Sequence, residues 1–425
     1  RIVMQWCLVS NPLKRNRMFL FSLHSCIIKG TYTSSFRVSP FLTLQQKFTT
    51  QNYGRAQPRG ILHPSNQILN PFMLNKRIIA LGSEQKWKDI LTLYHKHKRE
   101  MNMVNIATIY NQLSRNKSLS KQDPDFLRFL EETMKQIEAQ GLRRIGPRGF
   151  ANILHSLAKI RLSNNSYSLR MIAELESKEN VRILFEKENV QDVSNCVWSC
   201  ATLGIQSPKL FQMLELKSDW LFDKGKCQEV ANCVWACATL GIKSPKLFQT
   251  LESRAGWLLE NGKCQEVANC VWACAMLGVQ SPKLFHLLEL RAEWLFKNGK
   301  CQEVASCINA CAKLGIQSPN LFQLLDSKVD WLFANGTPQS VSNCAWSCAT
   351  LGIQSPKLFQ MLELRSDWLF EKGKCQEVAN CVWACATLGV PSPNLFQTLE
   401  SRSDWLFENG KCQEVASCVW SCAKL

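Results

Sequence analysis

The chain has 425 residues, enough for about three average domains, and its Lys and Arg exceed its Asp and Glu by 17. With 46% hydrophobic residues it is too apolar for a disordered polymer, and 20 Gly and 15 Pro are too few for a collagen-like or low-complexity chain. No uncharged apolar run reaches the roughly 18 residues of a membrane span, so we expect a soluble protein without one. The charge excess belongs to residues 1–189, because residues 190–425 hold 21 basic and 21 acidic side chains.

The N-terminal region has no acidic residue before Glu84 and carries 11 Lys and Arg. Acid-poor N-termini that contain Arg and Ser are typical of organelle transit peptides. A short apolar run at 18–28 follows a basic cluster at 14–17. The Thr-Tyr-Thr-Ser-Ser-Phe stretch that ends at Phe36 resembles the cleavage region of two-part leaders into algal plastids, and an ordinary mitochondrial presequence fits equally well. We therefore expect a largely disordered leader over 1–83 and a location in the mitochondrial matrix or the plastid stroma.

Both ends of the sequence suggest an incomplete chain. Arg1 is not an initiator, so translation is expected to start at Met4 or Met18, or upstream of this sequence. The last residue, Leu425, falls one residue before the next glycine of a regular series described below. We therefore expect that the sequence is a truncated gene model or a fragment.

From residue 190 onward the sequence repeats with a period of 37 residues. Two glycine series mark the period: Gly204, Gly241, Gly278, Gly315, Gly352, Gly389 and Gly225, Gly262, Gly299, Gly336, Gly373, Gly410. A fixed period of this size is typical of repeat architectures in which each unit is one supersecondary element.

Each unit begins with a predicted helix, called helix A, which spans 227–240 in one copy. Apolar side chains fall at helical spacing on one of its faces, at Val230, Cys233, Val234, Cys237 and Leu240. Gly241 follows, where a helix C-terminus favours a left-handed residue. In another copy Thr337 and Pro338 occupy the start, which is the order expected for an N-cap and first helical residue.

The second half of each unit predicts another helix, called helix B, which begins at Ser244-Pro245 and, in the preceding copy, runs over 208–224. Its apolar stripe consists of Leu210, Phe211, Leu214, Leu221 and Phe222. About two residues join helix B to the next helix A, so the two helices must fold back antiparallel. Since one hairpin cannot bury both of its faces, stacked hairpins must share a core. We predict an all-α fold, an α-solenoid of stacked antiparallel helix pairs, with six to seven regular repeats over 190–425.

Degenerate copies of the unit precede the regular ones. Residues 150–158 follow the helix A pattern, and residues 106–113 follow it more loosely, with Ile and Leu at the cysteine positions. Their helix B partners are expected at 125–140 and 167–187. The sequence therefore predicts degenerate helical repeats over 84–189, with the solenoid starting near residue 84.

Nineteen of the 21 cysteines lie in the regular repeats. Equivalent cysteines of neighbouring repeats should lie about 8–10 Å apart, beyond disulfide reach. Zinc needs four converging ligands, commonly with His, and the regular repeats contain one His, His286. Core packing is the favoured interpretation, no metal or other cofactor is predicted, and a thiol-based redox or metal sensor is the weaker alternative. At the helix A starts a cysteine follows a Lys, which predicts a lowered thiol pKa for Cys227, Cys264, Cys301, Cys375 and Cys412.

The face of helix A opposite the apolar one repeats three side chains that are candidates for ligand contact. The first is an asparagine, which can pair with a base edge, and the second a tryptophan, which can stack on a base or fill space between helices. The third position varies. The candidate base contacts are Asn195, Asn232, Asn269, Asn343, Asn380, Thr202, Thr239, Lys313, Thr350 and Thr387. One unit breaks the pattern with Ser306, Asn309 and Lys313. A hydrogen-bonded asparagine ladder between helices is the competing interpretation.

Helix B carries a basic side chain at one position of every complete copy. These candidate phosphate contacts are Lys217, Arg254, Arg291, Lys328, Arg365 and Arg402. An acidic series, which falls on the other flank of the exposed face, consists of Glu215, Glu252, Glu289, Asp326, Glu363 and Glu400. A solvated surface with balanced charge explains the two stripes equally well. The basic segment 76–161 is expected to add affinity for an anionic partner.

The repeat is similar to the heptatricopeptide and octotricopeptide repeats of organellar RNA-binding proteins, and to the FAST-kinase-like regulators. The resemblance lies in the Val-Ala-Asn-Cys-Val-Trp-Ala-Cys-Ala-Thr-Leu-Gly segment at 230–241, its copies and the 37-residue period. It covers 190–425 well and 100–189 loosely, and cysteine stands where the family usually has Leu or Ile. It implies selective binding of organellar transcripts, with effects on their stability, processing or translation. Such proteins often end in a RAP domain, which this sequence does not contain.

No catalytic constellation is recognisable, because the sequence has no phosphate-binding Gly-rich loop with Lys-Ser/Thr, His-rich metal motif or nucleophile elbow. We therefore expect a non-enzymatic protein whose partner is single-stranded organellar RNA. The alternative is a scaffold that binds protein partners through the same solenoid surface.

Overall fold

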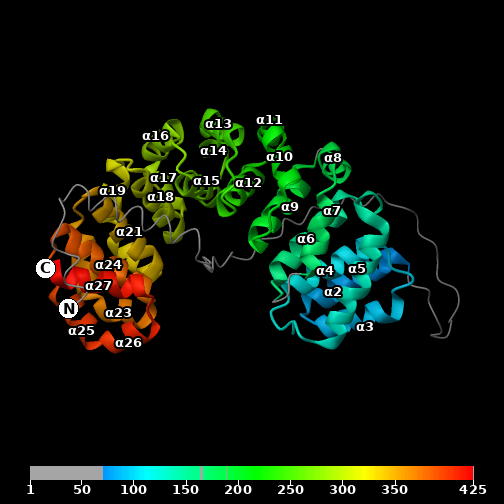
Figure 1. Cartoon of the computed structure of the whole chain (residues 1–425), viewed down its shortest axis with the longest axis horizontal. Coiled ribbons are helices and arrows are strands. Elements are labelled where there is room, and N and C mark those ends of the chain that lie inside the picture. The colour runs from blue at the N-terminus through cyan, green and yellow to red at the C-terminus, as the bar shows by residue number, and fades with distance from the viewer. Residues whose placement is uncertain (1–69, 163–165, 188, 425) are drawn as a thin grey trace, which may run out of the picture. The chain divides into compact units, whose positions relative to one another are not determined.

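The structure is a computed structural model that describes residues 70–162, 166–187 and 189–424. The predicted leader lies outside these ranges as far as residue 69. Within them every regular element is a helix, α2 to α27, as Figure 1 shows, which confirms the predicted all-α class. None of the helices in this part of the chain combines the length and the apolar character that crossing a bilayer requires.

The first helix of each regular unit packs against the first helix of the next unit, which confirms the predicted solenoid stacking. These A helices are α9 (Val190–Leu203), α12 (Cys227–Thr239), α15 (Cys264–Leu277), α18 (Cys301–Leu314), α21 (Pro338–Leu351), α24 (Cys375–Leu388) and α27 (Cys412–Lys424). Figure 1 shows them following one another in chain order from green to red.

The second half of each unit consists of two short helices. The first of each pair are α10 (Pro208–Leu216), α13 (Pro245–Ser253), α16 (Pro282–Leu290), α19 (Pro319–Ser327), α22 (Pro356–Leu364) and α25 (Pro393–Ser401). The second are α11 (Ser218–Lys224), α14 (Ala255–Asn261), α17 (Ala292–Asn298), α20 (Val329–Asn335), α23 (Ser366–Lys372) and α26 (Ser403–Asn409).

The prediction of one continuous helix B was therefore wrong. The helix is interrupted at the basic residue of the predicted phosphate stripe, for example at Lys217, whose φ and ψ are −101° and 22°. The next residue, Ser218, is fully buried, and its hydroxyl donates to the carbonyl of Glu215 at 2.7 Å. The same break occurs where this position is Ala255, Ala292 or Val329, so the hydroxyl is not its cause, and these three residues are buried as well. The bend lets the apolar residues of α10 and α11 both reach the core.

Seven further helices precede the regular repeats. They are α2 (Pro71–Ser83), α3 (Trp87–His97), α4 (Met103–Arg115), α5 (Pro124–Ile145), α6 (Pro147–Ile160), α7 (Ser166–Leu175) and α8 (Lys178–Glu186). The predicted degenerate A helices are α4 and α6, and α2, α4, α6 and α9 pack in succession. The packed helices begin at Pro71 rather than near residue 84, because Leu74 and Ile78 of α2 are completely buried.

The helix ends follow local sequence chemistry. Gly241 has a φ of 67°, the left-handed conformation that a side chain would strain, and its counterparts adopt the same conformation. The hydroxyl of Thr337 accepts a hydrogen bond from the backbone N–H of Ser340, which confirms the N-cap. Ser244 holds the N-cap position of α13, but its side chain makes no bond to its own helix.

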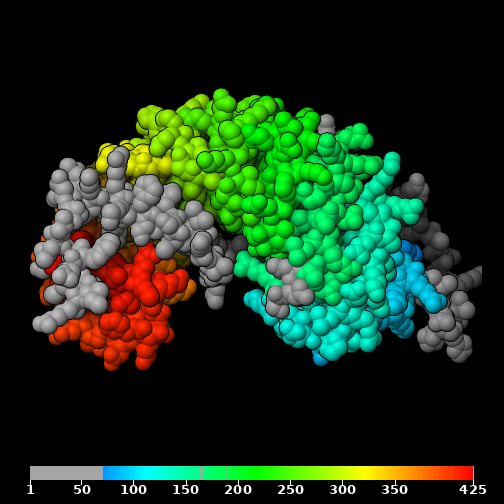
Figure 2. Space-filling view, viewed as in Figure 1, coloured from blue at the N-terminus to red at the C-terminus, as the bar shows by residue number. Residues whose placement is uncertain are grey.

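The core lies between two layers of helices. We call α2, α4, α6 and the seven A helices the A layer, and α10, α11 and their equivalents the B layer. Buried Val and Cys side chains of the A layer and buried Leu and Phe side chains of the B layer belong to one core. The exposed faces of the two layers therefore point away from each other. The space-filling view in Figure 2 shows successive repeats of the green part of the chain in close contact.

Candidate nucleic-acid interface

Three rows of side chains form the solvent face of the A layer. In α12 the residues from Val230 to Ala238 are buried except Asn232 and Trp235, and Thr239 follows as an exposed residue. The spacings of three and four residues place Asn232, Trp235 and Thr239 on one face of the helix. We call the equivalent positions of all A helices the asparagine row, the tryptophan row and the third row.

The tryptophan row contains half-buried rings, and two pairs of them contact each other across neighbouring repeats. Trp198 and Trp235 are stacked with ring centroids 6.4 Å apart and planes inclined by 28°. Trp346 and Trp383 have the same distance and angle. The rings therefore both pack between helices and present part of their surface to solvent, so the two interpretations of the tryptophans are compatible.

The asparagine row does not form a ladder in the described residues. The side-chain amides of Asn195, Asn232, Asn269, Asn343 and Asn380 make no hydrogen bond with another described residue. All five residues are half-buried, and none of these amides is among the fully buried polar groups. Their donors and acceptors are consequently turned to solvent and open to a ligand.

The third row differs from one repeat to the next. Thr239 and Thr350 donate their hydroxyl protons to carbonyls of their own helices, at 2.9 and 2.8 Å. The hydroxyl oxygens of Thr202 and Thr387 are buried and have no partner in the described residues. Lys313 lies with its Nζ 3.5 Å from the sulfur of Met276 in the preceding repeat. The threonines of this row are therefore less available to a ligand than the asparagines.

The rows continue upstream onto α6 and α4, which the sequence prediction of the site missed. His155 occupies the tryptophan position of α6, and its ring meets that of Trp198 edge-on at 4.8 Å. Asn152 and Lys159 hold the asparagine and third positions of α6, and Arg115 holds the third position of α4. The helix A pattern of residues 150–158 contained the signal, since it places Asn152 and His155 in the repeat register.

This upstream end of the A layer is cationic. Burial, Lys159 and Arg115 lower the pKa of His155 to about 3, so its ring is neutral at physiological pH. Burial and Arg115 also lower the pKa of Lys159. Residues 103–122 and 141–162, which include α4 and α6, contain no acidic side chain. Cations therefore gather here without neighbouring carboxylates from their own helices.

The rows contain no carboxylate, and the acidic side chains of the A helices have other roles. Glu229 accepts a hydrogen bond from the backbone N–H of Lys226 at 2.8 Å, and so helps to cap the N-terminus of α12. Glu266, Glu303, Glu377 and Glu414 do the same in other repeats. Burial raises the pKa of Asp192 to about 6. The A layer thus presents amides, indoles and cations, a combination suited to bases and phosphates.

The predicted phosphate stripe lies on the B layer, on the side of the core away from the three rows. Arg254 is paired with Asp223 at 2.6 Å. Arg291 donates to the carbonyl of Leu259 at 2.6 Å and lies over the ring of Trp294 at 4.8 Å. Lys217, Lys328, Arg365 and Arg402 are exposed. One strand cannot contact this stripe and the A-layer rows together without passing around an edge of the solenoid.

The acidic series of the B layer joins consecutive repeats. Glu252 accepts hydrogen bonds from the backbone N–H groups of Lys283 at 2.7 Å and Leu284 at 3.3 Å, and from the hydroxyl of Ser281. Glu215, Glu289, Asp326 and Glu363 accept equivalent backbone bonds. Each carboxylate therefore caps the first B helix of the next unit, which replaces the missing cap from that helix's own serine.

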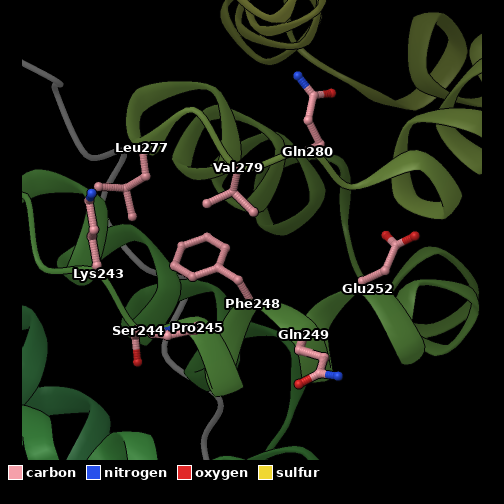
Figure 3. Close-up of a pocket in the computed structure, with 9 residues that line it drawn as sticks. All are labelled: Lys243, Ser244, Pro245, Phe248, Gln249, Glu252, Leu277, Val279 and Gln280. Atoms are coloured by element: carbon pink, nitrogen blue, oxygen red, sulfur yellow. The ribbon is translucent and has the colours of Figure 1, made fainter.

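Two grooves recur at the same position of the repeat. One, of about 510 Å³, lies between the turn that precedes α13 and the turn that follows α15. Figure 3 shows Phe248 and Val279 facing each other across it, with Gln249 and Gln280 at its rim. The other, of about 430 Å³, has Phe322 and Ile353 in the equivalent places. The grooves contain no residue of the three rows.

The repeat cysteines are free thiols, and all are buried except Cys412 and Cys422. The predicted lowering of the thiol pKa was wrong for four of the helix starts, because burial raises the pKa of Cys227, Cys264 and Cys301 to about 11 and also raises that of Cys375. Desolvation of the thiolate outweighs the neighbouring Lys and the helix N-terminus. Among the described residues no group of His, Cys, Asp and Glu side chains is arranged to hold a metal ion.

A family model described as RNA-editing substrate-binding complex 6 protein matches the chain at residues 141–296 and 258–425. Together the two matches extend from α5 to the end of the described repeats, so they include the A-layer rows from α6 onward. No curated protein matches the sequence.

Proposed function

The chain belongs to the family of the RNA-editing substrate-binding complex 6 protein, and on that premise we propose that it binds single-stranded RNA through the A layer. The asparagine and tryptophan rows would contact bases, with about one nucleotide per repeat, as in other helical-repeat RNA binders. The family name supports an RNA partner.

One observation carries this proposal. The asparagine amides lack intramolecular partners in the described residues, and they lie beside a row of partly exposed indoles, in which Trp198–Trp235 and Trp346–Trp383 stack as pairs. Amides supply hydrogen bonds to base edges, and indoles supply stacking surfaces. The same face bears no carboxylate in the three rows, so nothing there repels a phosphate backbone.

The phosphate contacts are assigned to cations of the A layer rather than to the B-layer stripe. Arg115 and Lys159 lie in the third row at its upstream end, and Lys313 lies in the same row further along. Because the B-layer stripe is on the other side of the core, we propose that it takes no part in binding the same strand.

The proposed setting is a mitochondrion or plastid, where the chain would act in the stability, processing or translation of transcripts. The acid-poor N-terminal region, which resembles a transit peptide, supports import into an organelle. The proposed role is not catalytic, and the chain would hold an RNA substrate for other proteins. The family name, which refers to a complex, supports protein partners as well.

A protein scaffold is the second candidate, and it is favoured by the grooves between consecutive repeats. The grooves at Phe248 and Phe322 repeat with an apolar floor and a glutamine rim, which suits an extended peptide. Basic and acidic side chains are balanced over 190–425. This role is compatible with RNA on the A layer, because the two surfaces do not overlap.

The test is binding of the purified full chain to a fluorescent single-stranded RNA of random sequence at 50 and 200 mM salt. Binding that weakens with salt but persists at 200 mM supports the proposal. The matched variant carries Asn195, Asn232 and Asn269 as Ala, and it should bind more weakly than wild type. Wild-type chain that does not bind RNA at either salt concentration contradicts the proposal and favours the scaffold.

A further inference from the structure

The α18 unit interrupts the A-layer rows. It carries Ser306, Asn309 and Lys313 where the preceding units carry asparagine, tryptophan and threonine or methionine. In the regular A helices α9 to α27, this is the one place where the tryptophan row contains an amide instead of an indole. The stacked pairs Trp198–Trp235 and Trp346–Trp383 lie on the two sides of this interruption.

The amide of Asn309 is available to a ligand. Its residue is half-buried, and its side chain makes no hydrogen bond with another described residue. The residues around it on the helix, Cys307, Ile308, Ala310 and Cys311, are all buried. Asn309 is therefore held on the solvent face by the packed helix, at the depth at which the other units present an indole.

A cation lies beside this amide. Lys313 is one helical turn further along α18, on the same face, and its side chain reaches back to Met276 of α15. Burial lowers the pKa of Lys313, and no carboxylate opposes this effect. Met276 also stands where most units have a threonine in the third row. The two residues that replace this threonine, Met276 and Lys313, therefore contact each other.

The chemistry of this unit differs from that of its neighbours. An indole stacks on any base, because every base has a π-face, so it holds a nucleotide without selecting it. An amide both donates and accepts, and it meets adenine with two hydrogen bonds, to N6 and N7. A lysine at the same place supplies a charge for the adjoining phosphate.

We propose that the α18 unit selects an adenine at one position of the bound RNA, through Asn309 on the base edge and Lys313 on the adjoining phosphate. This inference rests on the proposed RNA binding of the A layer. The units on either side hold their nucleotides through a row asparagine and a stacking indole, so the adenine is fixed in register relative to them.

The experiment is selection of RNA from a random single-stranded pool by three full-length chains: wild type, Asn309→Trp and Trp346→Asn. Asn309→Trp restores the side chain that other repeats accommodate at this position, so the fold should be retained. Trp346→Asn gives a regular unit the α18 side chain. Affinities for single-base variants of the selected RNA are then measured for each protein.

For wild type we expect one position at which adenine is preferred by about tenfold or more over the other bases. Asn309→Trp should abolish the preference at that position, and Trp346→Asn should add a second adenine preference. A selected sequence that is unchanged by Asn309→Trp, or a base other than adenine at the affected position, overturns the inference and leaves the proposed function standing. Absence of RNA binding by wild type instead overturns the proposed function.

Discussion

Trp198 and Trp235, which are one repeat apart, lie with their indole rings stacked at a centroid distance of 6.4 Å and an angle of 28°. The same distance and angle recur between Trp346 and Trp383. Each ring is half-buried, so it stabilises the contact between A helices and also offers an edge and part of a face to a ligand. A periodic aromatic surface of this kind matches the periodic bases of a single strand.

Replacement of Trp235 by Ala should weaken RNA binding. Stacking of a base on an aromatic side chain contributes about 1–3 kcal/mol, which corresponds to an increase in Kd of about 5- to 150-fold. The measurement is fluorescence anisotropy with a labelled single-stranded RNA. The control is Trp257→Ala, which removes a half-buried tryptophan that packs on Phe222 in the B layer. An equal loss of affinity in both variants would show that the effect arises from weakened packing.

Neutralising the upstream cations should change the salt dependence of binding. With Arg115 and Lys159 both replaced by Gln, the slope of log K against log salt should fall in magnitude by about two. The matched control replaces Lys328 and Arg365 of the B layer by Gln, and its slope should equal that of wild type. A reduced slope in the control alone would show that the RNA phosphates contact the B layer and not the A layer.

Removal of the cap between repeats should lower stability without affecting RNA contacts directly. Glu252→Ala leaves the backbone N–H groups of Lys283 and Leu284 without their acceptor, which should cost about 0.5–2 kcal/mol. Urea unfolding should show a lower midpoint, and hydrogen exchange of these two amides should accelerate. Glu260→Ala, an exposed change in the same unit, should leave both quantities unaltered within error. Equal behaviour of the two variants would refute the capping role.

The thiols should be distinguishable by their reaction with a disulfide reagent at pH 8. A thiol with a pKa of about 11, such as that of Cys227, is ionised in only about one molecule in a thousand at this pH, and its labelling should become faster as the pH rises toward 11. Cys412 and Cys422 are exposed and should react first. Cys412→Ser should therefore lower the number of rapidly labelled thiols by one, whereas Cys233→Ser should leave that number unchanged. A smaller number of rapidly labelled thiols in Cys233→Ser would show that Cys233 is reactive and would favour the redox interpretation.

The sequence predicted the A helices well because their boundaries depend on local chemistry. Gly241 in its left-handed conformation and the Thr337-Pro338 start follow from single residues, and the spacing of Val230, Cys233 and Cys237 identifies the buried face. The 37-residue period then predicted that each unit packs against the next one in the chain. The asparagine and tryptophan positions followed from the same spacing, because the face opposite the apolar one must meet solvent.

Features that depend on packing between units were not predictable. Glu215 caps a helix that begins about thirty residues later, so its sequence neighbourhood indicates only an exposed acid. The bend at Lys217 requires burial of Ser218, and the raised thiol pKa of Cys227 requires burial by the next repeat. The upstream rows on α6 were missed because His155 and Lys159 replace the residues that define the rows elsewhere.

Photo-cross-linking distinguishes RNA that lies on the A layer from RNA that lies on the B layer. The full chain would be bound to a single-stranded RNA that contains 5-iodouridine, irradiated, digested and analysed by mass spectrometry for modified residues. We predict cross-links to A-layer tryptophans such as Trp198, Trp235 and Trp346, and none to the B-layer tryptophans Trp257 and Trp331. Cross-links confined to the B layer would contradict the account.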